Sequence, residues 1–268
     1  MKVGLIDSLH CFPFYYHMME RMPIFGVKII SAYEGLLDKM MEIKELDMSP
    51  VSTALYSRMQ NDLLVVPDYC LNSEGYTRSI VMISKVPVEE LHGKRIGLSS
   101  ASETPSVVLK IILNNFYDIN PKYIKVDSNP LLYHLDAALI SGNEALIQNK
   151  ELIKYSYDIG DLWKRKTGYP VVFSLFAIQK EFIKKDREIL NRIIGSYEES
   201  LKELGNSESK IYQNAVERYP GFNYNIFNFY NTISYDLTDE LKEALMFFYN
   251  EAHSLELIDN KIDAIKFL

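Results

Sequence analysis

A histidine stands where the first predicted strand ends. The apolar segment Val3–Ile6 is typical of a short strand, His10 lies in the turn after it, and Pro13 marks the beginning of a helix. At neutral pH an imidazole can accept a proton from a substrate or donate a hydrogen bond to a carboxylate. His10 is therefore a candidate base or binding residue, and the alternative is a histidine that only shapes the turn.

Hydroxyl groups follow another predicted strand, at 46–51. Ser52 or Thr53 can cap the helix that begins there. Backbone N–H groups at the start of a helix, with hydroxyl groups beside them, can bind an anion. The turn is equally compatible with a plain capped helix.

A similar turn follows the predicted strand at 95–99. Thr104 is a suitable N-cap, Pro105 suits the first helical position, and Ser106 adds a second hydroxyl group. Open α/β sheets bind ligands at the carboxyl ends of their strands. We therefore expect this turn, Ser52-Thr53 and His10 to converge on one cleft.

The turn at 72–79 carries Arg78 and Ser79. Arg78 can pair with a ligand carboxylate or with Glu74, and Ser79 is expected close to the boundary between two lobes. No cluster of histidine, cysteine or acidic residues has the spacing of a metal site, so no metal ion is expected.

The elements that must position these residues alternate between strands and helices up to about residue 180. Strands are predicted at 3–6, 27–31, 46–51, 63–71, 77–84, 95–99, 123–126, 137–140, 155–157 and 171–179. Helices are predicted at 35–44, 104–116, 181–204, 207–219 and 237–255. Strands that alternate with helices form largely parallel sheets.

This pattern predicts an α/β protein with mixed, mostly parallel sheets and a helical C-terminal part. The first lobe is predicted to comprise 1–85 and 178–268, and the second 86–177, with the ligand cleft between them.

The composition narrows the classes of function. The net charge is −7 without a cluster of basic residues, whereas nucleic-acid binding needs a basic surface. The chain opens directly on a strand segment and contains no apolar run of membrane-spanning length. We therefore expect a cytoplasmic protein with no nucleic-acid or membrane partner, as a monomer or a homodimer.

Several segments, in their order and spacing, resemble the chorismate dehydratase family of the futalosine pathway of menaquinone biosynthesis. They are Val66-Pro67-Asp68, Ser73-Glu74-Gly75, Arg78-Ser79, Glu90–Ile96, Thr104–Val107, Asp136–Ile140, Gly142–Leu146, Tyr157–Gly160, Trp163-Lys164 and Gly168–Phe173. The resemblance implies a two-lobed fold of the type II periplasmic-binding-protein class. It also implies a carbon–oxygen lyase that removes water from chorismate, a dicarboxylate, to give 3-[(1-carboxyvinyl)oxy]benzoate without a cofactor.

The resemblance also suggests which residues form the site. The catalytic candidates are His10 and Ser79, and the substrate-binding candidates are Ser52, Thr53, Arg78, Thr104, Ser106 and Asn143. His10 stands where the family usually has an asparagine, and Asn143 where it usually has an aspartate. Histidine can act as a base near neutral pH whereas asparagine cannot. A side chain or the substrate's own carboxylate can be the base.

Two other functions fit the same fold. One is a binding protein, or a related enzyme, for another small cyclic or aromatic carboxylate. The other is the dihydroxynaphthoate-forming enzyme of the same pathway, whose Pro-Cys-Pro-Asn-Asp type of motif is absent from the beginning of this chain.

Overall fold

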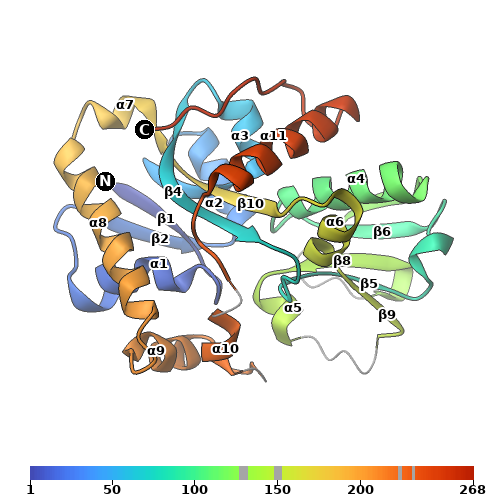
Figure 1. Ribbon diagram of the computed structural model, residues 1–268, viewed down its shortest axis with the longest axis horizontal. Coiled ribbons are helices and arrows are strands. Elements are labelled where there is room, and N and C mark those ends of the chain that lie inside the picture. Colours follow the sequence, from blue (N-terminus) through green and yellow to red (C-terminus); the bar gives the residue numbers. More distant parts are fainter. Residues whose placement is uncertain (127–131, 148–152, 223–224, 231–232) are drawn as a thin grey trace.

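The structure is a computed structural model. It describes residues 1–126, 132–147, 153–222, 225–230 and 233–268. The described residues form two lobes, each built around one sheet, and the strands β4 (Leu63–Ser73) and β10 (Val171–Gln179) extend from the first lobe toward the second (Figure 1). The predicted two-lobed α/β fold is confirmed.

The sheet of the first lobe has the strand order β2-β1-β3-β10-β4. Its remaining strands are β1 (Lys2–Ile6), β2 (Lys28–Ala32) and β3 (Met48–Ser52). β1 pairs in parallel with β2 and β3, whereas β10 is antiparallel to β3 and β4. The carboxyl ends of β1, β2 and β3 therefore lie at one edge of the sheet, and the turns after them can share a site.

The sheet of the second lobe repeats this arrangement with the order β7-β6-β8-β5-β9. Its strands are β5 (Ile80–Ser84), β6 (Arg95–Ser99), β7 (Lys122–Val126), β8 (Ala137–Ser141) and β9 (Tyr155–Asp158). β6 is parallel to β7 and β8, and β5 is antiparallel to β8 and β9. The single antiparallel strand in each sheet agrees with the predicted mixed, mostly parallel class.

The predicted lobe boundaries at 85/86 and 177/178 need correction. β5 pairs within the second sheet, and β10 pairs within the first along its whole length. The chain therefore changes lobe before β5 and again before β10. The physical reason is strand pairing, because both strands are mostly apolar and buried throughout, and their sequences do not show which sheet they complete.

Helices cover the sheets of both lobes. In the first lobe they are α1 (Phe12–Tyr16), a π-helical turn (His17–Arg21), α2 (Glu34–Glu42) and α3 (Thr53–Met59). In the second lobe they are α4 (Thr104–Tyr117), α5 (Asn143–Ile147) and α6 (Ile159–Thr167), with short 3₁₀ turns at Val88–Glu90 and Leu132–His134.

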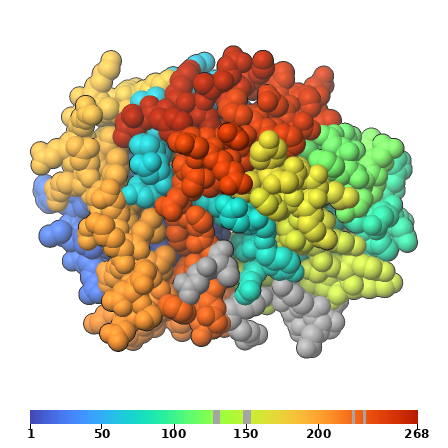
Figure 2. All heavy atoms as spheres, in the orientation of Figure 1, coloured from blue at the N-terminus to red at the C-terminus, as the bar shows by residue number. Residues whose placement is uncertain are grey.

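The C-terminal part is helical, as predicted. It contains α7 (Lys180–Ile183), α8 (Arg187–Leu204), α9 (Lys210–Arg218), α10 (Ile226–Tyr230) and α11 (Asp239–Ser254). The red atoms of the α11 region reach the green atoms of α4 in Figure 2, so this part touches both lobes. Among the described helices, none is long and apolar enough to cross a membrane.

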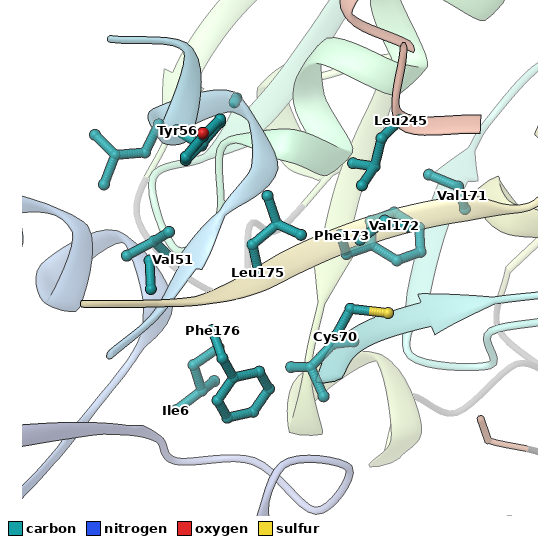
Figure 3. Close-up of a cluster of buried hydrophobic side chains, with 14 of the residues drawn as sticks. Ile6, Val51, Tyr56, Cys70, Val171, Val172, Phe173, Leu175, Phe176 and Leu245 are labelled. Atoms are coloured by element: carbon teal, nitrogen blue, oxygen red, sulfur yellow. The ribbon is translucent and has the colours of Figure 1, made fainter. Parts of the chain in front are cut away.

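β10 forms the centre of the core. All nine of its residues are buried. Figure 3 shows Leu175 on the side of the strand that faces Val51 and Phe176 on the opposite side, toward Ile6. Because both faces of the strand are covered, its sequence is an apolar run instead of an alternating one.

Candidate active site between the lobes

His10 lies in the turn between β1 and α1. Tyr235 donates its hydroxyl proton to the backbone oxygen of His10 at 3.0 Å, and Tyr230 donates to the oxygen of Leu9 at 2.8 Å. The imidazole atom Nδ1 is buried and has no hydrogen-bond partner among the described residues. A buried polar atom without a partner is unfavourable unless a ligand or a water molecule satisfies it.

Burial also determines the charge of His10. It lowers the pKa of the imidazole from 6.5 to about 4, because the charged form loses its hydration. His10 is therefore neutral at pH 7. A neutral imidazole has one nitrogen that can accept a proton.

A cavity of about 540 Å³ adjoins His10 and lies between the lobes. The turn after β1, the start of α2, the loop between β6 and α4, the turn between β8 and α5, and β10 all contribute to its wall. The volume is in the range that holds a small organic ligand. The carboxyl ends of several strands therefore meet at one site, as expected from the sequence.

A smaller cavity of about 50 Å³ lies next to the first, because His10, Ile80 and Phe173 line both. Ser79 lines this smaller cavity and is 7% exposed. The structure thus brings together His10 and Ser79, the two residues predicted to be catalytic.

Asn143 lines the larger cavity from the second lobe. Its Oδ1 accepts a hydrogen bond from the backbone N–H of Leu9 at 2.9 Å, and its Nδ2 donates to the oxygen of Asp7 at 3.2 Å. Its amide therefore joins the two lobes at the edge of the cavity next to His10.

The other edge of the cavity is also closed by contacts between the lobes. The N–H of Gly35 donates to the oxygen of Ala101 at 2.8 Å. The guanidinium group of Arg58 donates two hydrogen bonds of 2.8 Å to the carboxylate of Glu103. The lobes are thus held in a closed arrangement.

Four of the predicted binding residues do not line the cavity, and three of them support the structure around it. Ser52 caps α3 by accepting a hydrogen bond from Leu55 N, and Thr53 donates to Val172 O. Thr104 accepts a hydrogen bond from the N–H of Ala54, across the lobes. Ser106 is 9% exposed and is not among the described residues that line either cavity.

Arg78 lies in the segment where the chain crosses into the second lobe. Its backbone has a φ of 60°, and its N–H donates to Oδ2 of Asp158 at 2.7 Å. Asp158 also caps α6 and accepts two hydrogen bonds from Thr77. This aspartate, which the sequence analysis did not single out, fixes the crossing segment beside Ser79.

Sequence analysis also missed Glu34, the first residue of α2. This carboxyl group lines the larger cavity, is 6% exposed, and accepts hydrogen bonds from the hydroxyl groups of Ser102 and Ser174. Burial raises its pKa from 4.5 to about 7. The sequence feature that could have identified Glu34 is its position just after β2, because His10 has the corresponding position after β1.

The described residues contain no group of three or more histidine, cysteine, aspartate or glutamate side chains placed to hold a metal ion. The polar lining consists instead of hydroxyl, amide, imidazole and carboxyl groups. Such groups can bind ligand oxygen atoms and transfer protons.

Comparison with proteins of known structure identifies the fold. A protein from Archaeoglobus fulgidus is 16% identical with a TM-score of 0.78, and the match covers 96% of this chain and 98% of that one. An alkanesulfonate-binding protein from Xanthomonas axonopodis pv. citri, bound to MOPS, is 11% identical with a TM-score of 0.68, and 98% and 95% of the two chains are covered. The chain therefore has the periplasmic-binding-protein-like fold that the sequence predicted.

Comparison of sequences identifies the family. The chorismate dehydratase of Thermus thermophilus is 24% identical over an alignment of 173 residues, and the match covers 58% of this chain and 63% of that enzyme. The matched part thus spans less than two thirds of the length of that relative. A family model described as menaquinone biosynthesis matches residues 1–254. This chain belongs to the menaquinone-biosynthesis family.

Proposed function

We propose that this protein is a chorismate dehydratase, a carbon–oxygen lyase that forms 3-[(1-carboxyvinyl)oxy]benzoate and water. Its family and its similarity to the Thermus thermophilus enzyme support this activity. The observation that carries the proposal is the neutral imidazole of His10, which lines the cavity between the lobes and whose Nδ1 is buried without a partner among the described residues.

The reaction breaks two bonds on neighbouring ring carbons. His10 accepts the proton of the carbon that carries the enolpyruvyl ether, and the electron pair of that C–H bond becomes part of the ring. The C–O bond to the neighbouring hydroxyl group breaks, and the hydroxyl group leaves as water with a proton returned by the imidazolium of His10. Aromatisation of the ring drives the elimination, so the protein needs mainly to orient the substrate and move protons.

His10 suits this role once the substrate is bound. Its pKa of about 4 in the free protein reflects desolvation. A dicarboxylate in the cavity places negative charge near the imidazole, which raises the pKa of His10 and favours proton uptake. Ser79, which lines the same small cavity, is placed to donate a hydrogen bond to the departing hydroxyl group.

The substrate carboxylates are held by hydroxyl and amide groups in this proposal. Ser8 has a buried Oγ without a partner among the described residues, and Ser102 and Asn143 also line the cavity. Ser52, Thr53 and Thr104 position the helix starts behind the cavity wall.

The proposal is tested by incubating the purified protein with chorismate and separating the mixture by liquid chromatography with mass detection. A product lighter by one water, formed faster than with heat-denatured protein, supports the dehydratase. Loss of turnover in His10→Ala with binding retained supports His10 as the base. Tight binding of chorismate without turnover by folded protein would instead support a binding protein of this fold.

A further inference from the structure

The carboxyl group of Glu34 is held at the junction of three parts of the fold. Glu34 begins α2, Ser102 belongs to the loop before α4 in the second lobe, and Ser174 lies on β10. Both serine hydroxyl groups donate to the carboxyl group, and all three residues line the larger cavity. A ligand that enters the cavity therefore meets this group in a fixed orientation.

The cavity is lined by acidic groups and by His10, which is neutral at pH 7. Asp7, Glu34 and Glu144 line it, and no lysine or arginine is among the described lining residues. Asp7 has a cation nearby, since Arg218 lies 3.5 Å from its carboxylate and Tyr219 donates to it at 2.9 Å. Hydroxyl groups are the described partners of Glu34.

The groups packed around Glu34 also disfavour its charge. Glu103, beside Ser102, adds negative charge near it, and burial together with Glu34 raises the pKa of Asp38 on the same helix. Arg58 on α3 is the nearby cation, but it pairs with Glu103 and Glu42. Burial is the main cause that raises the pKa of Glu34 to about 7, so a large fraction of the protein carries a neutral Glu34 at neutral pH.

We propose that Glu34 is a specificity-determining residue of this cavity: the neutral carboxyl group admits a dicarboxylate, its ionised form excludes one, and binding therefore takes up a proton at Glu34. This inference rests on the proposed function, which supplies the dicarboxylate. A dianion beside Glu34 repels a second negative charge, and no lysine or arginine is among the described lining residues to offset it. The neutral acid can also donate a hydrogen bond to a carboxylate, which the ionised form cannot do.

The test uses 3-[(1-carboxyvinyl)oxy]benzoate, whose two carboxyl groups stay ionised between about pH 6 and about pH 8.5. Calorimetric titration in two buffers of different ionisation enthalpy gives both the affinity and the number of protons taken up. For the wild-type protein we expect the affinity to fall about tenfold per pH unit above about pH 7, with uptake of about one proton.

Three variants test which residue takes up the proton when the ligand binds. Glu34→Gln keeps an acceptor for the serine hydroxyl groups and is neutral at every pH, so its affinity is expected to stay constant. Glu144→Gln removes a charge from the same cavity, and Asp38→Asn removes the neighbouring buried carboxyl group. Both are expected to retain the pH dependence.

The outcomes separate this inference from the proposed function. A pH dependence that persists in Glu34→Gln, or disappears only in Asp38→Asn, overturns the role of Glu34. The wild-type titration needs no variant, and absence of proton uptake at about pH 8 also overturns it. Proton-linked binding without turnover of chorismate would reject the dehydratase and keep the inference about Glu34. Turnover of chorismate with pH-independent binding would support the dehydratase and reject the inference. Failure to bind either dicarboxylate would overturn both.

Discussion

The backbone N–H of Leu9, in the first lobe, donates a hydrogen bond of 2.9 Å to Oδ1 of Asn143, in the second lobe. The Nδ2 group of the same amide donates to the oxygen of Asp7 at 3.2 Å. The Asn143 side chain thus binds the backbone on both sides of Ser8, in the segment that leads into His10. The position of the imidazole is therefore linked to closure of the lobes.

Replacement of Asn143 by alanine is expected to weaken substrate binding. Each lost hydrogen bond contributes about 0.5–1.5 kcal/mol, so we expect KM for chorismate to rise about tenfold or more. Steady-state kinetics check this result. Asn114→Ala, at an exposed position of α4, is the matched control and should behave as the wild-type protein. Unchanged kinetics of Asn143→Ala would show that the lobes close without this contact.

Gly35→Ala is expected to keep the lobes apart. A Cβ atom at this position would lie 2.2 Å from the backbone oxygen of Ser100, in the facing lobe. A carbon atom cannot lie so close to a backbone oxygen, so the two segments must move apart. The hydrogen bond from Gly35 N to Ala101 O must then be lost. Small-angle scattering should show a larger radius of gyration, and KM should rise.

The control for this change is Gly195→Ala. Gly195 lies in α8 with no atom within 4 Å of an added Cβ, so alanine should stabilise the helix by about 0.5–1 kcal/mol and leave the scattering unchanged. An identical scattering curve for Gly35→Ala and the wild-type protein would contradict the expected separation.

The alternating pattern of strands and helices was sufficient to predict the lobes, because each element follows from local periodicity. Pairing between distant strands was not predictable in the same way. β5 and β10 are buried along their whole lengths and mostly apolar, so neither strand has a polar face that distinguishes its partner. The predicted lobe boundaries were displaced for this reason.

The site was predictable only in part. Residues at strand ends, such as His10, were found because topology alone brings those ends together. The use of each side chain depends on atomic contacts, and so Ser52 and Thr104 serve as structural partners behind the wall. Glu34 was missed because an acidic residue in the first turn of a helix is ordinarily a favourable surface residue.

The contacts of the Tyr230 and Tyr235 hydroxyl groups could not be predicted from the sequence either. Tyr235 packs against Phe14, and its hydroxyl group also donates a hydrogen bond to the backbone oxygen of His10. The two residues are more than 200 positions apart in the sequence, so no local sequence pattern predicts their contact.

The pH profile of kcat/KM is expected to have an acid limb well below the usual histidine range. If His10 is the base, protonation with a pKa of about 4 inactivates the free enzyme, so activity should persist to about pH 5. His10→Asn should lower kcat by about 100-fold or more, remove this limb, and change KM little. Full activity of His10→Asn would show that the substrate's own carboxylate takes the proton.

The stability of the fold should decrease as pH rises through neutrality, because of Glu34. Its pKa is raised from 4.5 to about 7 on folding, so the contribution is fully present below pH 4.5 and is lost as pH rises through about 7. Glu34→Gln cannot ionise. We therefore expect it to be more stable than the wild-type protein at about pH 8, by up to about 3 kcal/mol, and similar to it near pH 4.5.

Chemical denaturation at the two pH values measures this difference. Glu45→Gln, at an exposed position just after α2, is the control, and its free energy of unfolding should differ from the wild-type value by the same small amount at both pH values. A stability difference for Glu34→Gln that does not grow with pH would mean that the wild-type carboxyl group stays protonated, or stays solvated, across the range. If the carboxyl group stays protonated, proton-linked binding would occur at a higher pH. If it stays solvated, the burial that causes proton-linked binding would be absent.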